Sequence, residues 1–223
     1  NITKIVYPNG ASINYSYDVM NRPLLVVNKD AQNKKAEVFG YVYDPAGMVT
    51  KITREDGSFT EYAYDALNRL ARETSSKKQE SKRQEAKIKY DHQYSYDAVG
   101  NRLELIKGEG EEDGQQIKET YSYDAGNRLL GLTREKEKDG LPALVETVHY
   151  SYDNNGNRMS KEETKLDDDG QESEITYYSY DYENRLMNLE YTGDPDEEDI
   201  PNASFEYDGN GIRRKAVEGD TIT

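Results

Sequence analysis

Residues 62–70 read Tyr-Ala-Tyr-Asp-Ala-Leu-Asn-Arg-Leu, and the rest of the chain is built on the same pattern. Eight times, an aromatic residue, any residue, a tyrosine and an aspartate follow one another, and the second tyrosines are spaced by 26, 21, 32, 27, 29, 28 and 27 residues. Such self-similarity indicates a repeat protein. The signature residues are Tyr15, Tyr17 and Asp18; Tyr41, Tyr43 and Asp44; Tyr62, Tyr64 and Asp65; Tyr94, Tyr96 and Asp97; Tyr121, Tyr123 and Asp124; Tyr150, Tyr152 and Asp153; Tyr178, Tyr180 and Asp181; and Phe205, Tyr207 and Asp208.

Each signature aspartate is followed three residues later by asparagine or glycine, the residue types that best tolerate a left-handed backbone. Aspartate at the first position of a type I turn can cap that turn with its carboxylate. The pattern therefore predicts a tight turn that ends in a left-handed residue and reverses one strand into the next. The eight turn residues are Asn21, Gly47, Asn68, Gly100, Asn127, Gly156, Asn184 and Gly211.

An arginine follows the turn in seven of the eight repeats, and its position alternates. Odd-numbered repeats place it directly after the turn residue, whereas even-numbered repeats insert one residue before it. One added residue changes the facing of side chains, so we expect the two turn types to differ by a β-bulge. We expect each arginine to pair with an aspartate at the surface or to stack on tyrosine. The seven are Arg22, Arg69, Arg102, Arg128, Arg158, Arg185 and Arg213.

Two strand-like segments flank each turn. The incoming segment alternates tyrosine and aliphatic residues with small or polar ones, which is typical of a half-buried strand. At the far ends, hairpin dipeptides stand at 9–10, 56–57, 113–114, 139–140 and 169–170. The sequence thus predicts an all-β chain, a repeat array of antiparallel β-hairpins with about sixteen strands in one long, twisted sheet. We expect residues 1–223 to form a single array, with tyrosines stacked across strands into ladders.

The composition excludes several classes of protein. The chain has 44 acidic against 29 basic residues, a net charge of −15, which disfavours nucleic-acid binding. It has no cysteine, which excludes disulfides and thiolate metal sites. No apolar run approaches the ~18 residues of a membrane-spanning helix, and the N-terminus does not read as a signal peptide. Since the chain begins with Asn1 rather than methionine, we expect it to be an excised piece of a longer protein.

Catalytic and metal-binding chemistry finds little support in the residues. The two histidines, His92 and His149, have no nucleophile at motif spacing, and no phosphate loop or dinucleotide fingerprint is present. Acidic stretches at 109–113, 167–169 and 194–199 offer carboxylates for Ca²⁺, but none has the spacing of an ordered calcium loop. We therefore expect no enzyme activity, no catalytic residue and no cofactor or metal.

The repeated pattern resembles the YD repeat of Rhs proteins. The segments Tyr64-Asp65-Ala-Leu-Asn-Arg-Leu70 and Tyr152-Asp153-Asn-Asn-Gly-Asn-Arg158 carry the resemblance. The family includes bacterial Rhs and wall-associated polymorphic toxins, the C component of insecticidal Tc toxins, and animal teneurins. The resemblance implies a β-sheet strip that spirals into a hollow shell. In toxins of this family the shell encloses a C-terminal toxin domain, and the protein is secreted or lies at the bacterial surface.

The chain shows no self-cleavage segment and no toxin domain of the kind that the resemblance implies for complete toxins. We therefore expect a non-catalytic, structural β-shell segment, whose partners in the parent are adjoining repeats and an enclosed toxin domain. Open edge strands would also let chains pair with one another. The alternative is a carbohydrate-binding cell-surface adhesion module, because tyrosine faces suit stacking on sugars.

Overall fold

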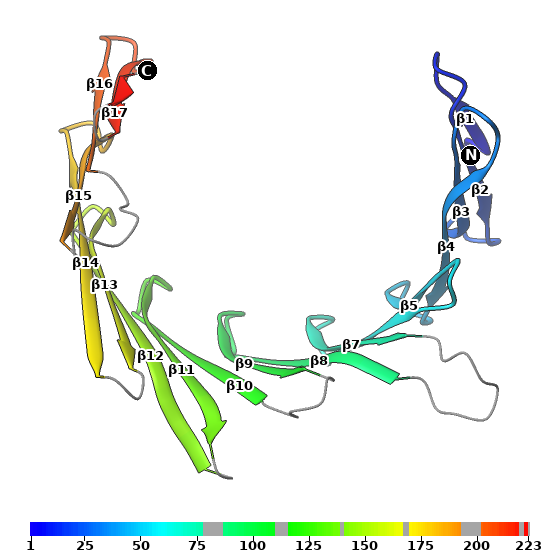
Figure 1. The fold of residues 1–223 in the computed structure, drawn as a ribbon, viewed down its shortest axis with the longest axis horizontal. Helices are drawn as coiled ribbons and strands as arrows, with labels where there is room; N and C mark the ends of the chain where they lie inside the picture. Colours follow the sequence, from blue (N-terminus) through cyan, green and yellow to red (C-terminus); the bar gives the residue numbers. More distant parts are fainter. Residues whose placement is uncertain are drawn as a thin grey trace. The chain divides into compact units, whose positions relative to one another are not determined.

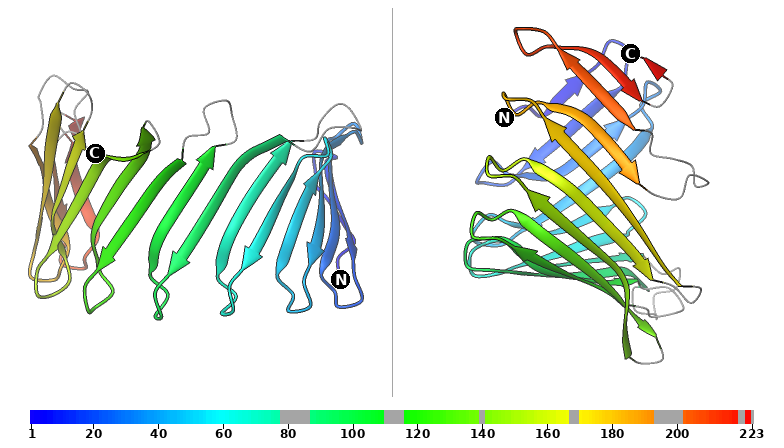
Figure 2. Two further views of the ribbon diagram at one scale, coloured as in Figure 1. Left: turned by 90° about the horizontal axis from the view of Figure 1, so that it is seen from below. Right: turned by 90° about the vertical axis from the view of Figure 1, so that its left-hand side faces the viewer.

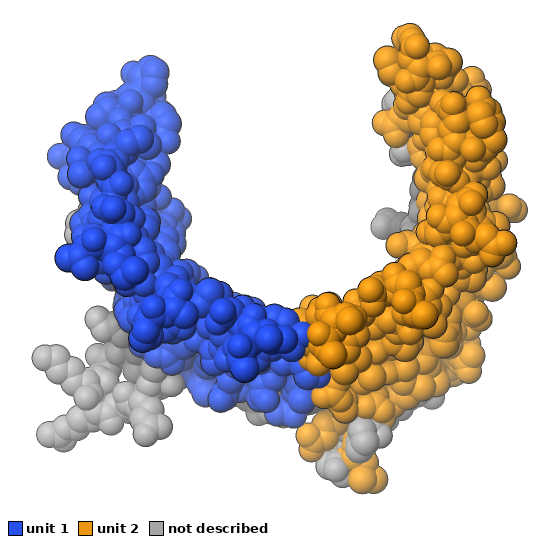
Figure 3. Space-filling view, turned by 180° about the vertical axis from the view of Figure 1, so that it is seen from behind, with its two compact units in different colours: residues 1–95, 105–116 blue, residues 96–104, 117–223 orange. Residues whose placement is uncertain are grey.

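The computed structural model describes residues 1–77, 87–109, 116–138, 141–166, 170–192, 202–218 and 221–222, and every regular element among them is a β-strand (Figure 1). The chain divides into two compact units, which are coloured in Figure 3. The first contains residues 1–95 and 105–116, and the second contains residues 96–104 and 117–223.

Nine strands run through residues 1–109 and nine more through residues 116–222. The first nine are β1 (Lys4–Val6), β2 (Ser12–Tyr17), β3 (Pro23–Lys29), β4 (Lys35–Tyr43), β5 (Val49–Arg54), β6 (Phe59–Tyr64), β7 (Leu70–Lys77), β8 (Lys87–Tyr96) and β9 (Arg102–Glu109). The others are β10 (Gln116–Tyr123), β11 (Leu129–Lys138), β12 (Leu141–Tyr152), β13 (Arg158–Leu166), β14 (Gln171–Tyr180), β15 (Leu186–Thr192), β16 (Ala203–Tyr207), β17 (Arg213–Glu218) and β18 (Thr221–Ile222). Sixteen of these strands form the eight predicted hairpins, and β1 and β18 flank them.

Within each compact unit, consecutive strands pair antiparallel. The strand that ends in the tyrosine pair is followed by the signature turn and then by the outgoing strand, as in β2 and β3, where Tyr15 lies opposite Val26 and Tyr17 opposite Pro23. In Figure 2 (left) the signature turns of each compact unit lie along the lower edge of its strands, opposite the ends at which the far-end connections begin. The all-β, antiparallel repeat fold predicted from the sequence is confirmed.

The expected difference between the two turn types is wrong. A register shift that marks a β-bulge lies directly before the second tyrosine in odd repeats, as at Ser16/Tyr17, and equally in even repeats, as at Ser151/Tyr152. The backbone loop also has the same length in both types, because the aspartate N–H always bonds to the carbonyl four residues later. The inserted residue of the even repeats therefore does not lengthen the turn; it moves the arginine one position along an unchanged backbone.

Few apolar side chains are fully buried among the described residues. Leu105, Val148 and Ala216 are the buried hydrophobic ones, while six polar residues, including Thr60 and Glu119, are equally buried. The signature aromatic residues are all half-buried, and the residue between each pair is always exposed. The described strands thus form a thin sheet that depends on backbone ladders and on half-buried tyrosines rather than on an aliphatic core.

The far-end connections fit the predicted hairpin dipeptides where they are described. Gly10 and Gly57 adopt positive φ angles of 87° and 78° in the turns that join β1 to β2 and β5 to β6. The dipeptides at 113–114 and 139–140, and Asp169 of the fifth, lie outside the described residues. A further far-end turn, Asp30–Asn33, joins β3 to β4 with the same backbone bonds as the signature turns.

Candidate functional site

All eight signature turns close in the same way. In the first repeat, Asp18 N–H donates to the Arg22 carbonyl (2.9 Å) and Asn21 N–H donates to the Asp18 carbonyl (3.1 Å), and the same two bonds recur in every other repeat. The third turn residue is left-handed throughout, with φ between 60° and 64° for asparagine and between 77° and 104° for glycine. A type I turn followed by a left-handed residue is a three-residue hairpin loop, so the predicted turn is confirmed.

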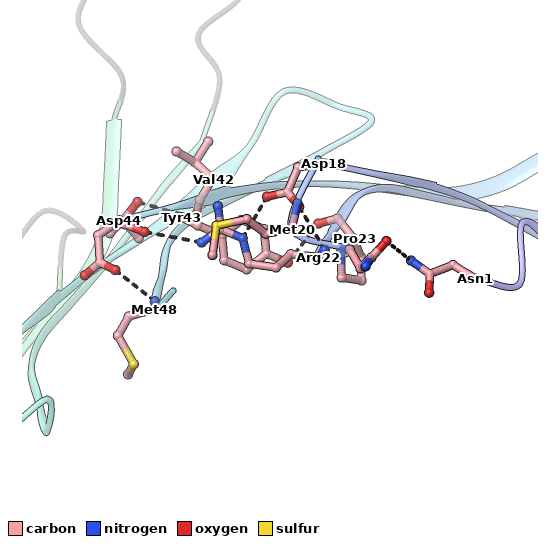
Figure 4. Close-up of polar contacts among 11 residues, drawn as sticks. Asn1, Asp18, Met20, Arg22, Pro23, Val42, Tyr43, Asp44 and Met48 are labelled. Carbon is pink, nitrogen blue, oxygen red and sulfur yellow. Dashed lines mark hydrogen bonds and ion pairs between the residues drawn. The ribbon is translucent and has the colours of Figure 1, made fainter. Parts of the chain in front are cut away.

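The turn aspartate also binds the arginine of the odd repeats. Asp18 Oδ1 accepts the N–H groups of Met20 (2.8 Å) and Arg22 (2.9 Å), while its Oδ2 accepts Arg22 Nε at 2.7 Å (Figure 4). We call this pair, the turn aspartate and the arginine four residues later, the clasp. Its members are Asp18–Arg22, Asp65–Arg69, Asp124–Arg128 and Asp181–Arg185.

The clasp arginine reaches forward to the next repeat. Arg22 Cζ lies 4.5 Å from the centre of the Tyr43 ring, and Arg22 Nη1 donates to the Asp44 carbonyl (3.3 Å). A guanidinium over an aromatic face is attracted by the ring's negative face. The first repeat is thereby linked to the second. The same two contacts join Arg128 to Tyr152 and Asp153, and Arg185 to Tyr207 and Asp208.

The second tyrosine of a repeat reaches back in the opposite direction. The Tyr43 hydroxyl donates to the Pro23 carbonyl at 2.8 Å, five residues after the preceding signature aspartate. The equivalent bond occurs in odd and even repeats alike, so it does not depend on where the arginine stands. The other described examples are Tyr64 to Val49, Tyr123 to Arg102, Tyr152 to Leu129 and Tyr207 to Leu186.

An asparagine replaces the clasp arginine in two of the even repeats. Asn101 Nδ2 donates both to Asp97 Oδ2 (2.8 Å), in its own turn, and to the side-chain oxygen of Asn127 (2.8 Å), in the next turn. Asn157 makes the same two bonds with Asp153 (2.9 Å) and Asn184 (2.8 Å). In these two repeats the inserted residue thus links the turn to the turn of the following odd repeat.

The arginine of an even repeat lies on the tyrosine face instead of at the turn. Arg158 stands opposite Tyr152 in the ladder, and directly opposed residues share a face of the sheet. Its guanidinium lies between the rings of Tyr150 (4.9 Å) and Tyr178 (5.5 Å). Arg102 over Tyr121 and Arg213 over Phe205 are placed similarly. The alternation thus sends successive arginines to two different places.

This arrangement changes the predicted tyrosine ladder. Among the described residues, the aromatic rings that stack on each other belong to a single strand: Tyr15 with Tyr17 (6.2 Å) and Tyr90 with His92 (4.6 Å). Between repeats the ring faces meet guanidinium groups. Among the described residues, the expected stacking of tyrosine on tyrosine across strands is not found, and Arg158 lies between the rings of Tyr150 and Tyr178 where such a stack was expected.

The choice of glycine or asparagine at the left-handed position follows from the same contacts. A Cβ on Gly156 would lie 3.9 Å from Arg128 Nη1, and one on Gly47 would lie 3.8 Å from Arg22 Nη1. A Cβ at these distances is in van der Waals contact with the guanidinium, so a longer side chain that points the same way would crowd it. The asparagine of the following odd repeat instead supplies an oxygen to the preceding one, as Asn184 does for Asn157.

Replacing Gly156 with asparagine is expected to destabilise the chain by about 1–2 kcal/mol, through the left-handed strain at φ 90° and the crowding of Arg128. Urea unfolding measures the loss. In an Arg128→Ala background the crowding is absent, so the loss should shrink by more than about 0.5 kcal/mol. An identical loss in both backgrounds would show that the arginine does not select glycine.

Hydrogen bonds lower the pKa of turn carboxyls in both odd and even repeats. For Asp18, Asp65 and Asp124 the largest cause is the backbone N–H of the arginine four residues later, and the side chain of that arginine lowers the pKa further. In Asp153 the pKa is lowered mainly by the side-chain amide of Asn157. The turns thus stabilise the ionised carboxylate in both repeat types.

Stability should therefore fall in acid. A carboxyl whose pKa is lower in the folded state contributes stability above its unfolded pKa and loses it as the pH falls through the folded pKa. With an ordinary value of 3.8, the loss should begin below about pH 4 and continue through lower pH. Urea midpoints measured between pH 7 and pH 2 test this, and Asp124→Asn should flatten the curve. A midpoint that stays constant down to pH 2 would contradict it.

A buried ion network on β10 to β12 is a feature that sequence motifs did not reveal. Glu119 is 4% exposed and lies opposite Arg134, which lies opposite Glu146. Arg134 Nη2 bonds to Glu119 (3.1 Å), its Nη1 bonds to Glu146, and the Tyr121 hydroxyl donates to Glu119. Burial, followed by the bond to Glu119, raises the pKa of Tyr121. The network joins three neighbouring strands.

The described residues assemble no catalytic or metal constellation around the histidines. His92 lies against Tyr90, and His149 is exposed in β12. Within the described ranges no group of three His, Cys, Asp or Glu residues is placed to hold a metal ion. The acidic stretches considered for Ca²⁺ lie outside those ranges, apart from the backbone of Glu109. No helix of the described residues is long and apolar enough to cross a membrane.

Comparison with known proteins supports the relationship suggested by the sequence. The RHS Repeat family model matches residues 43–80. The fold is similar to chains in the crystal structures of TcdB2-TccC3-Cdc42 (TM-score 0.54, 15% identity) and of TcdB2-TccC3 (TM-score 0.51, 13% identity). The likeness covers 96% and 93% of this chain but only 13% and 14% of those chains. The comparison with curated proteins gave no match.

The repeat and the fold lead to the same conclusion. The residues matched by the RHS Repeat model include the signature turn of the second repeat and the tyrosine pair and turn of the third repeat. The likeness to the two solved structures shows a shared fold. Residues 43–80 thus match the RHS Repeat family, and the other repeats of the chain carry the same signature as these residues.

Proposed function

We propose that residues 1–223 form a single array of eight YD repeats that serves as a non-catalytic wall segment of an Rhs-type shell. In a longer parent chain this wall would enclose or present a C-terminal toxin. The observation that carries the proposal is the continuity of the turn edge within each compact unit. Clasp arginines reach forward, tyrosine hydroxyls reach back, and each repeat thus contributes its signature residues to its neighbours rather than to a local pocket.

The similar solved structures support the setting in a longer protein, because this chain matches only 13% and 14% of those chains. They are structures of TcdB2-TccC3, and one of them also contains Cdc42. We extend from them the proposal that the partners of this array are adjoining repeats and an enclosed domain of the same parent. A parent of this type would be secreted or exposed at a bacterial surface.

A protection experiment on the parent protein tests the proposal. The region that follows this array should resist protease while the array is folded, and should be digested after the array is unfolded by acid or urea. Arg128→Ala together with Arg185→Ala, which removes two clasps, should lower the urea concentration at which protection is lost. Digestion of the following region at the same rate with and without the folded array would contradict the enclosing role.

The structure gives less support to the carbohydrate-binding alternative. Sugar stacking needs an open aromatic face, and in several repeats one face of the signature ring is covered by a guanidinium, as in Tyr43, Tyr121 and Tyr152. A glycan array with the intact chain is the direct check. Specific binding that Tyr121→Ala or Tyr152→Ala abolishes would favour the adhesion module over the wall.

A further inference from the structure

The N-terminal residues reproduce contacts that even repeats make with the odd repeat after them. Asn1 Nδ2 donates to the side-chain oxygen of Asn21 (2.9 Å), as Asn157 Nδ2 does to Asn184 (2.8 Å). The Tyr17 hydroxyl donates to the Ile2 carbonyl (2.6 Å), as the Tyr123 hydroxyl does to the carbonyl of Arg102, which follows Asn101. Asn1 and Ile2 are thus equivalent to the residues that stand four and five positions after the signature aspartate in an even repeat.

The strand register supports the same assignment. In β1 and β2, Lys4 lies opposite Asn14 and Val6 opposite Ser12. If Asn1 is aligned with Asn157, these two pairs correspond to Ser160 opposite Tyr177 and to Glu162 opposite Ile175. Both of these pairs occur between β13 and β14. Residues 1–6 therefore take the place that residues 157–162 take in the sixth repeat.

The other half of that repeat would lie on the outer edge of β1. In the sixth repeat, residues 160–162 pair with the tyrosine strand β12 as well as with β14. In the described ladder β1 pairs with β2, and Figure 1 shows β1 at the outer end of its compact unit. Tyr15 N–H bonds to the Thr3 carbonyl, so the backbone groups of Lys4 and Val6 are directed outward. The side chains of Ile2 and Val6 are exposed by 63% and 61%.

We propose that the outer edge of β1 is a docking site for a strand of sequence Tyr-x-Tyr-Asp-x-x-Gly, the incoming half of an even repeat. Asn1 makes the site selective. One N–H of its amide bonds to Asn21, and the docked aspartate would accept the other, as Asp153 accepts from Asn157. A strand from an odd repeat does not match this site. The odd repeats have arginine at the position that Asn1 holds, and the turn after an odd turn has glycine as its left-handed residue. Here the next turn has Asn21 instead.

Extension of the chain tests the site directly. Residues 148–156 (Val-His-Tyr-Ser-Tyr-Asp-Asn-Asn-Gly) are fused immediately before Asn1, so that the added glycine precedes Asn1 as Gly156 precedes Asn157. The matched control has the same length, with serine in place of both tyrosines and alanine in place of the aspartate. Docking would bond the outward amides of Lys4 and Val6, so their hydrogen exchange should slow at least about tenfold in the first extended chain and not in the control.

Two further arms make the outcome decisive. Asn1→Ala in the Tyr-Asp-extended chain should reverse most of the protection at Lys4 and Val6, because the bridge from the docked aspartate to Asn21 is lost. Equal exchange in the two extended chains would overturn the proposal. Protection of Lys4 in the unextended chain that rises with protein concentration would assign the edge to a second copy, and would equally overturn it. Since the readout is local to β1, it is independent of whether the array encloses a toxin.

Discussion

Replacing Asp18 with alanine is expected to lower the melting temperature about twice as much as replacing Asp30 with alanine. Both carboxylates cap the same kind of turn by accepting two backbone N–H groups: Asp18 from Met20 and Arg22, and Asp30 from Gln32 and Lys34. Only Asp18 belongs to a clasp. Its loss would also leave Arg22 without its ion pair, while that guanidinium lies over Tyr43 and bonds to the next repeat.

The comparison separates turn capping from the link between repeats. Asp30→Ala reports capping alone, and Asp18→Asn keeps an acceptor for the two N–H groups while removing the charge, so it should fall between the wild type and Asp18→Ala. Thermal unfolding followed by circular dichroism gives the melting temperatures. If Asp18→Ala and Asp30→Ala lowered them equally, the clasp would contribute nothing beyond an ordinary capped turn.

Replacing Asn68 with valine is expected to destabilise the chain by about 1–3 kcal/mol. Asn68 has a φ of 60°, where a β-branched side chain collides with the backbone. Ala66 lies two positions earlier in the same turn and is equally exposed, without a positive φ. Ala66→Val should therefore cost less than about 0.5 kcal/mol, as surface substitutions usually do.

Urea unfolding of the two valine variants, with Asn68→Gly alongside, provides the measurement. Glycine accepts the left-handed conformation without strain, so Asn68→Gly should stay close to the wild type. The turn assignment predicts the order wild type and Asn68→Gly, then Ala66→Val, then Asn68→Val. Equal losses for the two valine variants would show that the left-handed residue contributes no specificity to the fold.

The local part of the structure was predictable from the sequence. The turn depends on residues within one short segment, and aspartate followed by asparagine or glycine at fixed spacing specifies it chemically. The left-handed φ angles of Asn68 and Gly100 therefore agree with the prediction. The alternation of tyrosine with small residues likewise predicted which side chains are half-buried and which are exposed.

The sequence pattern did not predict the contacts between repeats. The alternate positions of Arg128 and Arg158 are visible in the sequence, but the neighbouring repeats that they contact are not: Arg128 reaches Tyr152 and Arg158 reaches Tyr178, 24 and 20 residues further along the chain. An arginine that moves one position along an unchanged backbone looks the same in the sequence as a turn that is one residue longer. For this reason a bulge was expected. Glu119 was missed for a related reason: its partners Arg134 and Glu146 meet it only through the register of three strands.

The alternation of the turns has a consequence for how such arrays grow and shrink. An odd turn presents an arginine that fits beside glycine, and an even turn with asparagine presents an amide that fits the asparagine after it. Removing or duplicating a single repeat would place two turns of the same parity side by side, with an arginine facing an asparagine or an amide facing a bare glycine. The smallest unit that can be added or removed without such a mismatch is therefore a pair of repeats, and recombination between related genes is expected to preserve this odd–even order even where the number of repeats differs.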